Sequence, residues 1–237
     1  GAVRCKEGRS VLFRNITNVL NFINARGISG CIKTIFYRAV DIFYEWYFRV
    51  STMGRVSVEK LGLDNSESVE YASVSYRHII EMLNRIPVDK SKSTLLDYGC
   101  GKGRVLVIAS ADRFKRIIGV EISRLISTAR ENIHGMRHRE TEDVVLEQCD
   151  AAEYDIPLDV NIIFFFNPFR GSTLKSVVEK IRSSYEKSPR DIFIIFFNND
   201  HFEKAIISHH WLSKIYQSDF HHNISCGLYR TFPYGKN

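Results

Sequence analysis

The chain has 237 residues, of which 44% are hydrophobic and 25% charged. These are the values of an ordinary globular protein, and they exclude a disordered or fibrous chain. The formal net charge of +6 is concentrated in residues 1–60, which hold ten basic and four acidic side chains, while the rest of the chain is balanced. A uniformly basic surface for nucleic acid is therefore disfavoured, and the sequence predicts a basic N-terminal segment joined to a neutral body.

The N-terminal segment is rich in aromatic residues and predicts two helices, over residues 11–25 and 31–50. In the second, apolar residues recur at steps of three and four with charges between them. We expect this helix pair to pack on the body; the alternative is contact with a membrane surface or an acidic partner through residues 11–50. A polar stretch over residues 61–70 precedes an amphipathic helix over residues 76–86. The predicted domains are therefore a helical extension over residues 1–65 and a main domain over residues 66–237.

From residue 93 onward, apolar strands alternate with helices. Strands are predicted over residues 94–98, 116–121, 144–148, 160–166 and 192–197, and helices follow them up to residue 111 and over residues 123–137, 173–187 and 201–208. The last two strands, over residues 214–220 and 226–232, are separated by a short polar stretch that is typical of a hairpin. This order predicts an α/β fold, a doubly wound and mostly parallel sheet of seven strands that closes with an antiparallel hairpin.

Cysteine, histidine and membrane patterns exclude several classes of protein. The five cysteines are far apart and form no C-x-x-C pair, which argues against a disulfide framework or a zinc ribbon and indicates a reducing, cytoplasmic compartment. Five of the eight histidines lie between residues 201 and 222, but their adjacent pairs lack the i,i+4 spacing of metal ligands on a helix. We therefore expect no metal site. No uncharged run is long enough to span a membrane, so we expect no transmembrane segment.

The most informative segment is the turn after the first strand of the main domain, where Asp97 precedes three alternating glycines. Glycines here allow positive φ and let a ligand lie directly on the backbone. Glu121 ends the next strand, where a carboxylate can accept both hydroxyls of a ribose, and Asp150 follows the third, where a carboxylate can accept an adenine amino group. Asp97 suits a cationic ammonium group and is badly placed for a pyrophosphate. Each acid alone is more simply a solvated strand end, but together they converge on the crevice where open α/β sheets bind ligands.

These residues resemble class I S-adenosylmethionine-dependent methyltransferases over about residues 71–237. More narrowly, the D-x-G-C-G-K-G-R turn and the later N-P-F sequence are similar to a group of small bacterial methyltransferases. The resemblance implies S-adenosylmethionine as cofactor, with the glycines under its methionine part, Asp97 at its ammonium group, Glu121 at its ribose, and Asp150 with the Ala151 backbone at its adenine. Tyr71 and Tyr76 are expected as lids over the methionine end. The implied cofactor-binding residues are Tyr71, Tyr76, Asp97, Tyr98, Gly99, Cys100, Gly101, Gly103, Glu121, Ile122, Asp150, Ala151 and Asn167.

The fourth strand ends at Asn167, Pro168 and Phe169, at the rim of the same crevice. This sequence is similar to the N-P-P-Y/F motif of amino-group methyltransferases, from which it departs by lacking the second proline. An Asn side-chain oxygen and a backbone carbonyl can accept the hydrogens of an amine, and an aromatic face can hold a flat or cationic substrate. These three residues are therefore the candidate catalytic residues. The alternative is a strand-terminating turn with Phe169 packed inward.

The sequence thus predicts a methyltransferase that transfers a methyl group to an amine or other nucleophile on a small molecule or protein. Two alternatives stay open. One is a nucleic-acid methyltransferase, against which the neutral body argues. The other is a catalytically silent adenosyl-binding scaffold recruited through residues 11–50. Lys102 and Arg104, just after the glycines, are expected either to bind a substrate anion or to form a solvated helix face.

Overall fold

The computed structural model describes residues 29–61, 71–166, 169–198, 200–206, 211–220 and 224–232. The predicted helix over residues 11–25, the paired histidines, Asn167 and Pro168 lie outside these ranges. The chain divides into two compact units, residues 1–40 and residues 41–237. The predicted domain boundary between residues 65 and 66 also lies outside the described ranges, and it stays a prediction.

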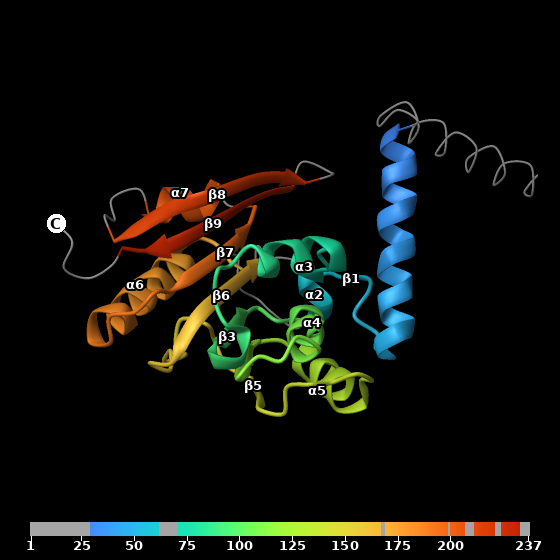
Figure 1. Ribbon diagram of the computed structural model, residues 1–237, viewed down its shortest axis with the longest axis horizontal. Helices are drawn as coiled ribbons and strands as arrows, with labels where there is room; N and C mark the ends of the chain where they lie inside the picture. Colours follow the sequence, from blue (N-terminus) through green and yellow to red (C-terminus); the bar gives the residue numbers. More distant parts are fainter. Residues whose placement is uncertain are drawn as a thin grey trace, which may run out of the picture. The chain divides into compact units, whose positions relative to one another are not determined.

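The second unit is built on a seven-stranded sheet in the order β5-β4-β3-β6-β7-β9-β8 (Figure 1). Five neighbouring strands are parallel: β3 (Thr94–Tyr98), β4 (Arg116–Val120), β5 (Val144–Glu147), β6 (Val160–Phe166) and β7 (Phe193–Phe197). The hairpin of β8 (Leu212–Phe220) and β9 (Ile224–Thr231) is antiparallel and joins the sheet through β9 and β7. The predicted fold class is confirmed. The strand order reverses between β3 and β6, which is where open α/β sheets bind ligands at the carboxyl ends of their strands.

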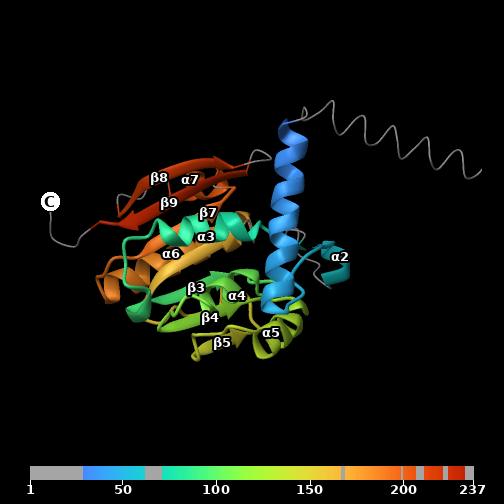
Figure 2. The same cartoon turned by 45° about the vertical axis from the view of Figure 1, so that its right-hand side comes forward.

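Helices cover both faces of this sheet (Figures 1 and 2). One face packs against α3 (Tyr76–Asn84), α4 (Arg104–Ser110) and α5 (Leu125–Gly135), and the other against α6 (Gly171–Lys187) and α7 (Asp200–Ile206). Successive side chains of a strand enter opposite layers, so Leu95 lies in the first core and Leu96 in the second. Because the central strands are buried on both faces, β7 is a continuous apolar run in the sequence and β6 is apolar except for Asn161.

Four short elements were not predicted from the sequence. β1 (Arg55–Val56) pairs antiparallel with β2 (Tyr71–Ala72), and α2 (Val58–Leu61) follows β1. A single 3₁₀ turn, η1 (Lys90–Lys92), leads into β3. The two-residue strands are too short to show an alternating pattern, so only the contact between two distant segments reveals them.

The helix over residues 29–48 crosses the boundary between the two units. Within the second unit Phe48 is buried in the core, whereas Ile42, Phe43 and Trp46 are exposed. None of the helices in the described ranges has the length and apolar character that a membrane crossing requires. Contact of residues 11–50 with a membrane surface or an acidic partner stays a prediction.

Candidate functional site

The glycine turn leaves β3 at the switch point and leads directly into α4. Gly99, Gly101 and Gly103 have φ of 72°, 54° and 83°, in the left-handed region that glycine adopts readily. The amides of Gly99 and Cys100 both donate to the carbonyl of Val120 at the end of β4, at 2.8 and 3.1 Å. The turn is therefore fastened to the neighbouring strand by its own backbone.

Glu121 follows β4 and is held by two backbone amides. Its Oε2 accepts a hydrogen bond from the Gly101 N–H at 2.9 Å, and its Oε1 accepts one from the Ser123 N–H at 2.8 Å. The residue is 9% exposed. A carboxylate has about four acceptor positions, so each oxygen keeps capacity for one more donor. This geometry suits a ligand with two neighbouring hydroxyl groups.

Asp97 is a buried carboxyl group that no cation among the described residues pairs with. It is 3% exposed, and no described residue pairs with it or donates a hydrogen bond to it. Burial, and secondarily the charge of Glu121, raise the pKa of Asp97 well above its usual value. Because a buried carboxylate is costly unless it is paired, this position favours a ligand that brings a positive charge.

The third acid, Asp150, stands in the turn after β5. Its Oδ1 accepts a hydrogen bond from the Ala152 N–H at 2.8 Å, which shapes the turn, and Ala151 is buried beside it. Ile122, next to Glu121, has 44% of its surface exposed. An exposed apolar side chain next to a carboxylate is suited to a flat, partly polar group.

Three predicted site residues face the core. Tyr98 is fully buried and stacks on Phe165 with ring centroids 5.3 Å apart. Phe169 is 8% exposed and packs edge-on against both rings. The Cys100 side chain is 5% exposed and lies in the layer of α4. This inward position of Phe169 agrees with the alternative to a catalytic role, in which Phe169 packs inward after a strand-terminating turn.

Tyr71 and Tyr76 have different surroundings. Tyr76 is fully buried, and its hydroxyl donates to Glu45 Oε1 at 2.8 Å. Tyr71 is half-buried, and its hydroxyl donates to the carbonyl of Thr52 at 2.7 Å. The Tyr71 ring occupies the space that a side chain at Gly101 would need, because a Cβ added there would lie 2.3 Å from Cε2 of the ring. Gly101 thus accommodates an aromatic ring as well as a positive φ.

Arg104, the first residue of α4, is neither an anion site nor a solvated residue. Its side chain is 4% exposed and forms ion pairs with Asp41 at 3.2 Å and Glu45 at 3.3 Å. Nε donates to Thr52 Oγ1 at 2.8 Å, and Nη1 donates to the Val74 carbonyl at 2.9 Å. The expectation for Arg104 was wrong because its partners lie some sixty residues earlier in the sequence. The i,i+4 acid pair of Asp41 and Glu45, in an otherwise basic segment, was the available signal.

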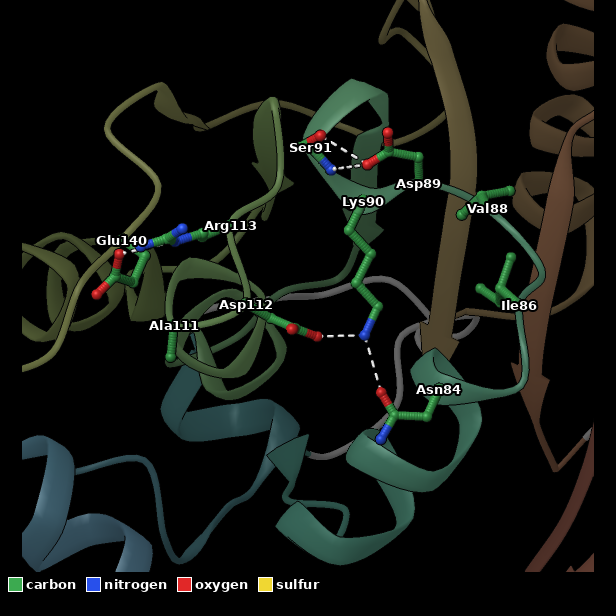
Figure 3. Close-up of a pocket in the computed structure, with 10 residues that line it drawn as sticks. All are labelled: Asn84, Ile86, Val88, Asp89, Lys90, Ser91, Ala111, Asp112, Arg113 and Glu140. Atoms are coloured by element: carbon green, nitrogen blue, oxygen red, sulfur yellow. Dashed lines mark hydrogen bonds and ion pairs between the residues drawn. The ribbon is translucent and has the colours of Figure 1, made fainter.

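A separate polar recess lies near the amino end of β3 (Figure 3). In it Lys90 forms an ion pair with Asp112 and donates to Asn84 at 2.8 Å, while Arg113 pairs with Glu140 at 3.0 Å. These charges neutralise one another within the recess, and they lie at the opposite end of the strand from the glycine turn. The described residues contain no group of three His, Cys, Asp or Glu side chains that could hold a metal ion.

Comparison with protein families decides the class of this site. A family described as "Methyltransferase domain" matches residues 89–227, which is more than half of the chain. The chain belongs to this methyltransferase family. The matched residues include the glycine turn and all three strand-end acids, so the predicted enzyme class is confirmed at the level of a methyltransferase. The narrower resemblance to one bacterial group stays a prediction.

Solved structures agree on the fold. A SAM-dependent methyltransferase from Aquifex aeolicus superposes with a TM-score of 0.51 at 12% identity, over 65% of this chain and 89% of that one. An RNA methyltransferase from Salinibacter ruber, solved with S-adenosyl-L-homocysteine, has a TM-score of 0.49 at 21% identity, over 70% and 97% of the chains. At 12% identity the likeness to the Aquifex aeolicus structure shows the fold alone, which is the Rossmann-like methyltransferase fold. A search of curated proteins found no match.

Proposed function

We propose that this methyltransferase uses S-adenosylmethionine, bound across the carboxyl ends of β3, β4 and β5. The observation that carries the proposal is Asp97, a buried carboxyl group that no described residue neutralises. A cofactor with a pyrophosphate would bring negative charge to this position, whereas the ammonium group of S-adenosylmethionine would neutralise the carboxylate.

The other groups of the cofactor match the neighbouring residues in order across the sheet. Each oxygen of Glu121 can accept one ribose hydroxyl while it keeps its hydrogen bond to Gly101 or Ser123. Beyond it, the exposed Ile122 supports one face of the adenine, and Asp150 with the Ala151 backbone meets its polar edge. The main-chain atoms of the glycine turn line the methionine part.

The chain's own contribution to the reaction is chiefly positioning. When bound, S-adenosylmethionine supplies a methyl group on a sulfonium, which is already a good leaving group. The protein must align the acceptor with that methyl group, which can supply much of the rate enhancement. The proposed acceptor is an amine or other nucleophile on a small molecule or protein. We assign the contact with it to the Asn167 side-chain oxygen, since the Phe169 ring packs inward on the rings of Tyr98 and Phe165.

The cofactor assignment can be tested by isothermal titration calorimetry with S-adenosylmethionine and S-adenosylhomocysteine. Glu121→Ala is expected to lower both affinities at least about 100-fold, because hydrogen bonds to a charged group contribute about 1.5–3 kcal/mol each. The matched control is Glu142→Ala, which removes an exposed acid near the start of β5. Unchanged affinity in the Glu121 variant, with the control also unchanged, would refute the assignment.

The Asn167→Ala variant distinguishes cofactor binding, measured by the same titration, from methyl transfer, measured by an activity assay. This variant is expected to bind the cofactor as tightly as the wild type and to transfer the methyl group more slowly once an acceptor is identified. Tight cofactor binding by the wild type without transfer to any acceptor would instead support the silent scaffold.

A further inference from the structure

The segment over residues 41–56 is fastened to the glycine turn, although it lies outside the matched family region of residues 89–227. Arg104, one residue after Gly103, holds this segment through its ion pairs with Asp41 and Glu45 and its bond to Thr52. Glu45 in turn accepts a hydrogen bond from the Thr52 N–H at 2.8 Å. The chain that follows the N-terminal helix is thereby brought to the first turn of α4.

Two more side chains hold residues 51–53 against the same turn. Lys102, within the glycine turn, donates from Nζ to the Met53 carbonyl at 2.9 Å. Asn132 of α5 accepts from the Ser51 N–H at 2.9 Å and donates to the Lys102 carbonyl, also at 2.9 Å. Because Asn132 is only 7% exposed, it joins the two backbones in a largely dry setting. Residues 51–53 therefore have a defined position beside the turn.

Tyr71 completes this contact. Its hydroxyl bonds to the Thr52 carbonyl, and its ring lies against the α-carbon of Gly101. Burial raises the pKa of Tyr71, and the charges that act on it include those of Arg104, Glu45 and Asp97. Because Gly101 stands in the turn that follows Asp97, the ring lies at the Asp97 end of the site, which the proposed function assigns to the amino-acid part of the cofactor. Since Tyr71 is only half-buried, part of its surface stays open to a ligand.

We propose that residues 51–53 and Tyr71 form the wall of the cofactor site at its methionine end, and that Tyr71 contacts the amino-acid part of bound S-adenosylmethionine. This inference rests on the proposed function and adds a wall from outside the matched family region. It also divides the two tyrosines: Tyr71 contacts the ligand, whereas Tyr76 supports the wall by packing on Arg104, with its ring centroid 4.2 Å from Cζ.

The test compares two ligands that differ at the methionine end. S-adenosylhomocysteine carries the amino-acid part, whereas 5′-methylthioadenosine has the same adenosine but lacks the amino and carboxyl groups. Tyr71→Ala is expected to weaken binding of S-adenosylhomocysteine at least about tenfold and to change binding of 5′-methylthioadenosine less than about twofold. Tyr71→Phe keeps the ring and is expected to restore affinity to within about threefold of the wild type.

Controls separate a local contact from a general loss of structure. Tyr216→Ala removes a half-buried ring from β8 that stacks on Arg85, and it should leave both affinities unchanged. Thermal unfolding of each variant reports whether the protein is folded; if Tyr71→Ala does not fold, Tyr71→Leu takes its place.

Each outcome decides the inference. Equal weakening of both ligands would overturn it, because a distorted glycine turn affects the adenosine end as well. Unchanged binding of both would show that Tyr71 does not touch the ligand, and tighter binding would show that the ring obstructs the site. If the wild type binds neither S-adenosylmethionine nor S-adenosylhomocysteine, the proposed function fails, and the inference fails with it.

Discussion

At the scale of single residues, Asp97 links stability to binding. Its carboxyl group is buried beside Glu121, so its pKa in the folded protein lies well above the usual value of 3.8. The folded state therefore retains this proton over a range of pH in which the unfolded chain has released it. Stability falls as pH rises through that range, from the unfolded pKa up to the folded pKa. Above it, the free protein carries a buried charge that no described residue pairs with and that a cationic ligand would offset.

Replacing Asp97 by asparagine should raise the stability of the unliganded protein and weaken cofactor binding. At neutral pH the unliganded Asp97→Asn variant is expected to unfold at a temperature a few degrees higher, since about 1 kcal/mol shifts the midpoint by about 2–4 °C at this size. Its affinity for S-adenosylmethionine is expected to fall at least about tenfold. Differential scanning calorimetry and titration calorimetry measure the two effects. Asp143→Asn, at a carboxylate that is 57% exposed, is the control, and a midpoint that drops in Asp97→Asn would contradict this account.

The same group predicts how binding depends on pH. An ammonium group favours the ionised carboxylate, so binding should release a proton wherever Asp97 is protonated in the free protein. Wild-type affinity is therefore expected to rise as pH increases toward the raised pKa of Asp97 in the free folded protein, and to level off above it. Titrations in two buffers with different ionisation enthalpies would detect the proton. A release of the same size in Asp97→Asn would assign it to another group.

At the scale of secondary-structure elements, the close packing of α4 on β4 shapes the site. Gly119 of β4 is in register with Asp97 of β3. A Cβ at Gly119 would lie 2.7 Å from Cδ1 of Leu106 in α4 and 2.9 Å from Cδ2 of Leu146 in β5. The missing side chain lets the helix approach the strand. In this arrangement the Gly101 N–H, just before α4, lies 2.9 Å from Oε2 of Glu121, just after β4.

Adding a methyl group at Gly119 should therefore be costly. Gly119→Ala is expected to destabilise the protein by about 1–3 kcal/mol, the usual cost of overpacking a core. Gly135→Ala is the matched control at the end of α5, where a Cβ would have no described neighbour within 4 Å. It should be neutral or stabilising by up to about 1 kcal/mol, since alanine favours helix more than glycine does. Urea unfolding compares the two, and equal effects would rule out the packing explanation.

At the scale of the whole molecule, one buried ion cluster joins the N-terminal part of the second unit to the sheet. Arg104 faces both Asp41 and Glu45, and all three side chains are at most 13% exposed. Asp41 also accepts a hydrogen bond from the Tyr76 N–H at 2.9 Å, at the start of α3. The cluster therefore connects the N-terminal helix, α3 and α4.

Removing the cation should leave two buried acids unpaired. Arg104→Met is expected to cost about 3–5 kcal/mol of unfolding free energy in urea, the usual effect of breaking a buried pair. Arg113→Ala removes an arginine that is 78% exposed and should cost less than about 1 kcal/mol. A loss in Arg104→Met no larger than in the control would show that the cluster does not hold the segment in place.

The sheet and the acids around the glycine turn could be predicted because their signals are local. The run from Val160 to Phe166 is apolar except for Asn161, and its observed bounds are the predicted ones. Other elements differ by one to a few residues at their ends, as when α3 stops at Asn84 rather than at residue 86. Helix ends depend on capping and packing, which periodicity does not resolve.

The sequence by itself determined the succession of strands and helices along the α/β domain, the glycine turn and the acids that follow three parallel strands, since each depends on residues close together in the chain. Only the tertiary structure decided the partners of Arg104, the inward packing of Phe169 and the position of Tyr71 on Gly101. The Arg104 ion pairs join residues 59 and 63 positions apart, and no local pattern specifies which distant side chain will fill a given space. The sequence shows the positive charge of the N-terminal segment directly. The role of its two acids, Asp41 and Glu45, is known only from the structure, in which Arg104 is buried and forms ion pairs with both.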